Sequence, residues 1–199
     1  MPIDLDSLRV EVLPSERTDP TAEVTKDLGG GIAARLVSAG ESGPQPLASA
    51  VVDLPVERLL TIGVGATIRA ELEGIDVRPH TVGEHRYLGA AIDGSPYVSS
   101  MLISPAVPFG LRGVDDLLVA SPRRSLVICR PMERSFPDPC ATLQRLVSGV
   151  FRDAADPCTP HVYWWRQGAL HRIHVDHQAR HVTVPPEVAG LVDTLPRQL

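Results

Sequence analysis

Apolar and polar residues alternate over residues 7–14, SLRVEVLP, and the run stops at a proline, which predicts a strand. A second strand is predicted over 32–39, IAARLVSA, between clusters of turn residues. The apolar run over 48–55, ASAVVDLP, has the length of a third strand. These runs predict a single domain over residues 1–199, in which residues 1–54 can form a small strand-rich subdomain.

The segment 55–74 is the first predicted helix, with Pro55 suited to its first turn. Its apolar residues recur at helical spacing: Leu59, Leu60, Val64, Ile68 and Leu72. Gly63 and Gly65 each weaken a helix by about 1 kcal/mol relative to alanine. The segment can therefore break into two pieces at the glycines.

Residues 75–105 predict strands separated by turns, and a clearer hairpin follows over 115–131, DDLLVASPRRSLVICRP. Its runs LLVA and SLVIC are nearly continuous and apolar, which is typical of strands buried on both faces. The intervening SPRR, residues 121–124, is expected to form the turn.

A second helix is predicted over 137–157, with Asp138 as its N-cap and Pro139 in its first turn. Its apolar stripe consists of Leu143, Leu146, Val147, Val150 and Phe151. Two linked hairpins follow, and residues 185–199 predict a short terminal helix. The order of elements predicts an α+β fold with a mixed or mainly antiparallel sheet, built from hairpins, and about three helices.

Composition narrows the function classes. The net charge of −5 argues against nucleic-acid binding, which needs a basic face. No apolar run approaches the 18 or more residues of a membrane span, and the N-terminus has no apolar core of signal-peptide length. The chain has 3 cysteines and no CxxC spacing. We therefore expect a cytoplasmic protein with no membrane and no nucleic-acid partner.

Three stretches carry a resemblance to a known family: SPYVSSMLI, DDLLVASPRRSLVICRP and HVYWWRQGALHRI. Over roughly residues 88–175 the chain resembles the YtpQ-like family of uncharacterised bacterial proteins, which has a similar hairpin, helix and closing Trp-Arg-x-Gly turn. The chain departs from that family after SMLI, where SPAVPFGLRG replaces a longer helical segment. The resemblance implies a cytoplasmic α+β fold and carries no catalytic residue over to this chain.

The stretch HRIHVDHQARH, residues 171–181, holds four of the chain's 7 histidines. A turn centred on Gln178-Ala179 pairs Asp176 with His181 and His174 with Thr183, which puts these four side chains on one face of the hairpin. His174, Asp176 and His181 are the residue types that ligate zinc or iron. Arg172 on the same face would repel a cation, and a fourth ligand would have to come from His80, His85 or His161. The alternative is a polar, solvent-facing hairpin with no metal.

The same reasoning for HVYWWRQGALHRI places its turn at Gln167-Gly168 and pairs Trp165 with Leu170 and Tyr163 with Arg172. Tyr163, Trp165, Leu170 and Arg172 then share a face, and aromatic and arginine side chains are enriched where protein partners bind. The alternative is that a helix covers this face, so that the residues belong to the core.

Cys140 falls in the first turn of the second predicted helix, where the helix dipole favours a thiolate. It is thus a candidate reactive thiol, although an inert buried cysteine fits the pattern as well. The stretch GGGI, residues 29–32, lacks the spacing of a phosphate-binding loop, and no nucleophile elbow is present.

The sequence therefore favours a non-enzymatic protein-interaction module of adaptor, chaperone or immunity type that uses the face of its C-terminal hairpins. The alternative is a small metal-binding protein or a metal-dependent hydrolase that uses the histidine-rich hairpin. A protein partner is expected in the first case, and zinc or iron in the second.

Overall fold

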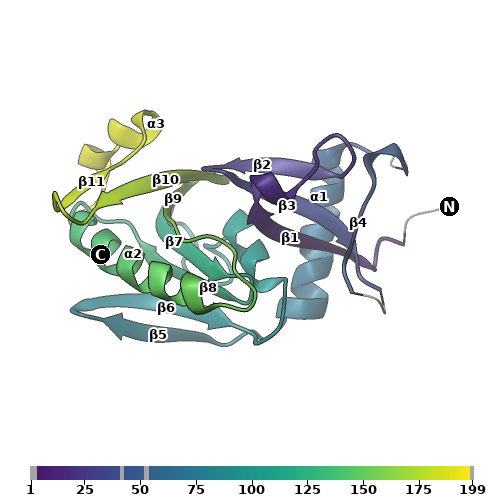
Figure 1. Ribbon diagram of the computed structural model, residues 1–199, viewed down its shortest axis with the longest axis horizontal. Helices are drawn as coiled ribbons and strands as arrows, with labels where there is room; N and C mark the ends of the chain where they lie inside the picture. The colour runs from purple at the N-terminus through teal and green to yellow at the C-terminus, as the bar shows by residue number, and fades with distance from the viewer. Residues whose placement is uncertain (1–3, 41–42, 52–53, 198–199) are drawn as a thin grey trace.

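The computed structural model describes residues 4–40, 43–51 and 54–197. Two antiparallel sheets make up the fold, one from the N-terminal part of the chain and a larger one from the rest (Figure 1). The N-terminal sheet consists of β1 (Leu8–Pro14), β3 (Ile32–Ser38) and β2 (Thr25–Gly29) in that order, with β4 (Gln45–Pro46) paired to β3.

The larger sheet has seven strands, and every pairing in it is antiparallel. Their order is β11 (His181–Thr183), β10 (Ala169–Asp176), β9 (Val162–Arg166), β7 (Asp116–Arg123), β8 (Leu126–Pro131), β6 (His85–Ala91) and β5 (Val77–Val82). The predicted α+β class, with a mainly antiparallel sheet built from hairpins, is confirmed.

The helices are α1 (Val56–Thr67), α2 (Pro137–Asp153) and α3 (Pro186–Ala189). A π-helical turn, η3 (Ile68–Leu72), extends α1, and short 3-10 turns lie at η1 (Ser15–Arg17), η2 (Ser49–Val51), η4 (Val98–Ile103) and η5 (Val192–Thr194). Among the described residues, no helix has both the length and the apolar character needed to cross a membrane.

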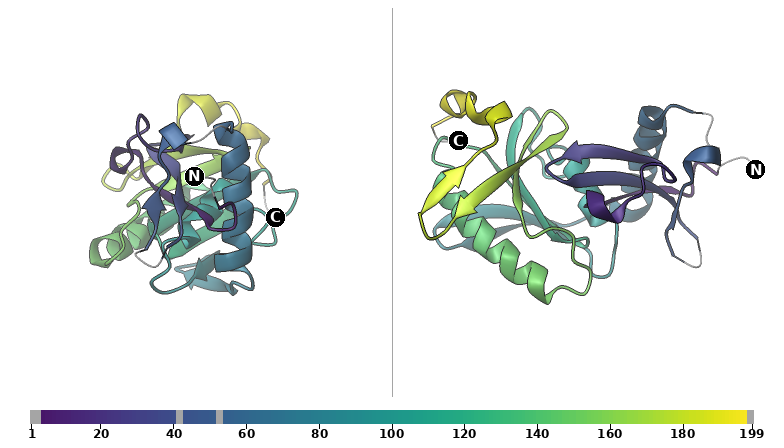
Figure 2. Two further views of the ribbon diagram at one scale, coloured as in Figure 1. Left: turned by 90° about the vertical axis from the view of Figure 1, so that its right-hand side faces the viewer. Right: turned by 45° about the horizontal axis from the view of Figure 1, so that its top comes forward.

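The central strands of the seven-stranded sheet are buried on both faces, as the apolar strands 117–120 and 125–129 predict, whereas most of β5 and β11 is exposed. Leu117 and Val119 of β7 pack into a core shared with the N-terminal sheet and α1, whereas Leu118 and Ala120 pack into a core shared with α2. Figure 2 shows α2 lying along the sheet and the N-terminal sheet with α1 gathered at the other end of the molecule. The alternation of side chains along a strand thus assigns successive residues to two different layers.

A glycine turn lets the N-terminal sheet approach the larger sheet closely. Gly29 and Gly30 have φ values of 88° and 63°, where glycine is favoured. A Cβ on Gly29 would lie 2.6 Å from the carbonyl oxygen of Leu170, and one on Gly30 would lie 2.8 Å from the ring of Tyr163. The glycines of the stretch GGGI therefore allow the two sheets to pack closely at their junction.

Three local predictions are wrong in detail. The 48–55 run is no strand where the structure describes it, because 49–51 form a 3-10 turn; residues 52–53 lie outside the described part. The SPRR segment does not form the turn, since β7 continues through Arg123 with an irregularity after Ala120. The first helix does not break at its glycines, since α1 runs through both of them. Gly63 instead allows α1 to pack closely on β3, because a Cβ at this position would lie 2.4 Å from the side chain of Leu36.

The glycine turn gives a direct test of the junction. We expect Gly31→Ala, whose φ is 82° and whose Cβ would meet nothing within 4 Å, to lower the free energy of unfolding by about 1–2 kcal/mol through backbone strain alone. Gly29→Ala should cost an additional 1–3 kcal/mol, roughly, because its Cβ would meet the Leu170 carbonyl. Urea unfolding of the two variants measures the difference, and equal losses would contradict the close approach.

Candidate functional site

The two C-terminal hairpins have the registers that the sequence predicts. Leu170 lies opposite Trp165 and Arg172 opposite Tyr163 in the first hairpin, and Asp176 lies opposite His181 in the second. Gln167 and Gly168 form the first turn with φ values of 48° and 84°. The side chains of the two hairpins therefore divide between the two faces of the sheet as expected. The elements that cover each face differ from the prediction.

The predicted partner-binding face is largely buried. Tyr163, Trp165 and Leu170 are 1%, 9% and 2% exposed and belong to the core shared with the N-terminal sheet, so the expectation of an exposed aromatic surface is wrong. Gly29 and Gly30 lie against Leu170 and Tyr163, and the indole N–H of Trp165 donates to the carbonyl of Ile103 in η4, so the alternative that these residues belong to the core holds. Arg172, further along β10, is the one exposed member of the predicted set.

The histidine-rich hairpin does not assemble a metal-ligand group. His174, Asp176 and His181 are exposed, and among the described residues no cluster of three or more His, Cys, Asp or Glu side chains could hold an ion. The Asp176 carboxylate instead accepts hydrogen bonds from the backbone N–H groups of Gln178 and Ala179, both at 2.9 Å. These two hydrogen bonds lower the pKa of Asp176, and the bond from Ala179 has the larger effect. The zinc or iron site stays a prediction from the sequence.

Cys140 lies in the first turn of α2 but points into the core. Its side chain is fully buried among the apolar residues beneath the helix, and this burial raises the pKa of the thiol to about 12. Desolvation thus outweighs the helix dipole that was expected to favour a thiolate. The environment of Cys140 contradicts the prediction of a reactive thiol.

The start of α2 also differs from the predicted cap. The helix begins at Pro137 with Phe136 as its N-cap residue, so Asp138 lies inside the first turn. The Asp138 carboxylate points away from the helix and contacts His85 of β6, with 2.8 Å between Asp138 Oδ2 and His85 Nε2. Proline suits the first helical position, and Pro137 satisfies that preference two residues before Pro139.

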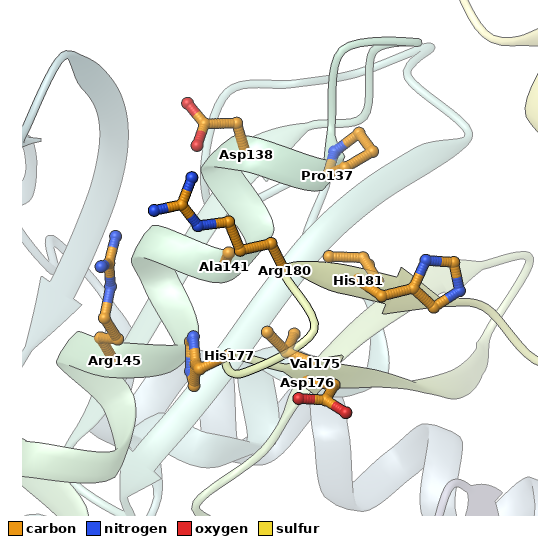
Figure 3. Close-up of a pocket in the computed structure, with 10 residues that line it drawn as sticks. Pro137, Asp138, Ala141, Arg145, Val175, Asp176, His177, Arg180 and His181 are labelled. Atoms are coloured by element: carbon orange, nitrogen blue, oxygen red, sulfur yellow. The ribbon is translucent and has the colours of Figure 1, made fainter.

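The main surface cavity lies between the N-terminal half of α2 and the hairpin of β10 and β11 (Figure 3). Its volume is about 740 Å³, within the range of binding sites. The lining residues are Pro137, Asp138, Ala141, Arg145, Val175, Asp176, His177, Arg180, His181 and Val182. Ala141, Val175 and Val182 are half-buried and provide an apolar floor.

Cationic side chains stand around this floor. Figure 3 shows Arg145 of α2 and Arg180 of the hairpin turn reaching out beside Ala141, with the His177 ring below them and the His181 ring turned away. Within the described part of the chain, neither guanidinium forms an ion pair. Both lining carboxylates have other partners, since Asp138 contacts His85 and Asp176 closes its own turn. Among the described residues, neither carboxylate is ion-paired with these arginines, so both guanidinium groups keep their hydrogen-bond donors available to a ligand.

A second, smaller cavity of about 230 Å³ adjoins the first, because Val175 and His177 line both. Its lining residues are Gln144, Ser148, His161, Arg172, Ile173, His174, Val175 and His177. The half-buried His161 has a lowered pKa, first through burial and then through the positive charges of Arg172 and His174. We call the two adjoining cavities together the basic groove.

No family model matches the chain, and neither a curated protein nor a solved structure matches it. The resemblance to the YtpQ-like family stays a prediction from the sequence.

Sequence reasoning named His174 as a candidate metal ligand and Arg172 as a partner-binding residue, and it missed Arg145 and Arg180 as members of a site. Arg145 lies off the apolar stripe of its helix, and Arg180 lies in a turn with a φ of 52°. The available signal was the concentration of Arg and His in 171–181 without a neighbouring acidic run. The groove itself depends on the packing of α2 beside the hairpin, which no local pattern specifies.

The thiol environment predicts the reactivity of Cys140. At pH 7.5 we expect iodoacetamide to label it only on unfolding, because a pKa of about 12 leaves almost no thiolate. Mass spectrometry of the native protein and of the protein in urea measures the two rates. Rapid native labelling of Cys140 would restore the reactive-thiol hypothesis.

The surroundings of His161 predict a pH dependence of stability. Because its folded pKa lies below the ordinary value of 6.5, the unfolded chain binds the proton more readily. The contribution is complete above pH 6.5 and declines as the pH falls below it. We expect His161→Gln to lose less stability than the parent chain between pH 7.5 and pH 5.5 in urea unfolding; identical losses would show that His161 titrates normally.

Proposed function

We propose that the chain is a non-enzymatic interaction module that binds an acidic segment of a protein partner in its basic groove. The observation that carries the proposal is the pair of guanidinium groups of Arg145 and Arg180, neither in an ion pair among the described residues, beside an apolar floor. Charge complementarity supports an acidic partner, since arginine recognises carboxylates through paired N–H donors. The function class is the one the sequence favours, and the site lies on the α2 side of the same C-terminal hairpins.

The apolar floor supports a peptide over a nucleic acid as the occupant. Val175 and Val182 offer a contact surface for an apolar side chain. A nucleic acid needs an extended basic face, whereas this cavity provides two arginines beside an apolar floor. The ligand is thus a short segment with an apolar anchor flanked by Asp or Glu.

We also propose the cytoplasm as the compartment of this module. All three cysteines, Cys129, Cys140 and Cys158, are free thiols in the structure. Unpaired cysteines support a reducing compartment, where disulfides rarely persist.

The test uses fluorescein-labelled 12-residue peptides with one leucine flanked by glutamates, and a matched set flanked by lysines. Fluorescence anisotropy should show binding of the acidic set only, with affinity falling as salt rises from 50 to 500 mM. The Arg145→Ala/Arg180→Ala variant should bind about 10- to 100-fold more weakly, because two charge-assisted contacts are lost. The control Arg58→Ala/Arg112→Ala removes the same charge from exposed sites outside the groove and should bind normally.

Amide shifts in ¹H–¹⁵N spectra locate the bound peptide. We expect shifts at Arg145, Val175 and Arg180. Acidic peptides that fail to bind, or that shift only distant residues, would overturn the proposal. Stronger binding of labelled oligo-dT than of any acidic peptide would replace the protein partner with a nucleic acid.

A further inference from the structure

We propose that the smaller cavity of the basic groove is a phosphate subsite, so that the acidic segment bound there carries a phosphorylated side chain. The inference rests on the proposed function and names its ligand more closely. Its basis is the set of side chains that meet in this cavity from α2, from the segment before β9 and from β10.

The lining of the cavity has the donors that a phosphate requires and lacks a competing acid. Arg172 and three histidines, His161, His174 and His177, contribute to it, and among its described lining residues no carboxylate is present. The planar guanidinium of arginine matches two phosphate oxygens at once. A small polar cavity of this composition fits a compact dianion better than it fits a carboxylate, which carries half the charge.

Ser148 adds an oriented hydroxyl. The Gln144 amide donates hydrogen bonds to the backbone carbonyl of Pro160 and, at 3.0 Å, to Ser148 Oγ. Because Ser148 Oγ accepts this bond, its own O–H remains available to donate into the cavity. Gln144 is therefore held in place by two contacts, and Ser148 becomes a neutral donor beside the cations.

Charges of both signs act on His161. Besides burial, Arg172 lowers the pKa of His161, Glu16 raises it, and His174 lowers it by a smaller amount than either. A bound dianion would compensate these cations. The cavity thus gains from an anion in a way that an already paired cluster does not.

The position of the cavity links the phosphate to the rest of the ligand. Val175 and His177 line both cavities, so the two openings meet at the end of β10. A phosphorylated side chain in the smaller cavity and an apolar side chain in the larger one can therefore belong to one short segment. Arg145 and Arg180 would then contact the acidic residues on either side of the apolar anchor.

Three peptides of one sequence test the subsite: a leucine anchor among glutamates, with serine, phosphoserine or glutamate at a single neighbouring position. The phosphoserine peptide should bind about tenfold more tightly than the serine peptide, and the glutamate peptide should gain less. Arg172→Ala should remove the phosphoserine advantage and leave serine-peptide binding nearly unchanged. Arg172→Lys, which keeps the charge but loses the paired donors, should retain part of the advantage.

The controls separate this inference from the proposed function. Arg58→Ala should leave all three affinities unchanged, and unfolding curves check that Arg172→Ala, at an exposed position, remains folded. Equal affinity for the serine and phosphoserine peptides, or an advantage that survives Arg172→Ala, would overturn the phosphate subsite while the acidic-segment function stands. Binding of the phosphoserine peptide alone would keep the subsite and overturn the acidic-segment function.

Inorganic phosphate distinguishes the two sources of the anion. At millimolar concentration it should compete with the phosphoserine peptide and shift the resonances of His161 and Arg172. If phosphate shifts these resonances and yet no peptide discriminates between serine and phosphoserine, the cavity holds free phosphate and the phosphorylated-segment proposal fails.

Discussion

Successive side chains of β7 enter two different cores, because the seven-stranded sheet is covered on both faces. Leu117 and Val119 meet the N-terminal sheet, and Leu118 and Ala120 meet the α2 layer. Every other feature depends on this arrangement. The cover on the first face removes Tyr163 and Trp165 of β9 from solvent, whereas the cover on the second face buries Trp164 and leaves a gap between α2 and the last hairpin, which becomes the basic groove.

The buried carboxylate of Glu11 links the N-terminal sheet to the seven-stranded sheet. Glu11 of β1 is 1% exposed, and its two oxygens contact Arg35 at 2.8 Å and Arg124 at 3.3 Å. Arg35 lies directly opposite Glu11 on β3, and Arg124 lies in the turn between β7 and β8. A charge left unpaired in such a place costs several kcal/mol, roughly 3–5 when one partner is removed. The three residues therefore join the two sheets at a defined point, while apolar packing supplies most of the stabilisation.

Sequence patterns predicted the hairpin registers but missed some local details and the contacts between distant residues. Both C-terminal hairpins have the expected registers, since a turn such as Gln167-Gly168 and the alternation of its flanks define them together. The burial of Trp165 could not be foreseen, because it depends on distant residues such as Ile103, whose carbonyl accepts a hydrogen bond from its indole N–H. Asp138 was expected to cap α2, but His85, 53 residues earlier, provides a partner that no helix rule contains. The groove escaped prediction for the same reason, and the sequence placed Arg172 in a partner-binding face and His174 in a metal site instead.

Some contacts between the N-terminal sheet and the rest of the fold join residues that are made at very different times. The carbonyl of Val12 accepts a hydrogen bond from the thiol of Cys158, 146 residues further along the chain. At a synthesis rate of about 5–20 residues per second, that interval lasts on the order of 10 s. During this time the first strands have emerged from the ribosome, and the surface that will receive them does not yet exist. The junction must therefore close after translation is nearly complete, and until then the nascent chain presents an apolar sheet edge that a chaperone would recognise.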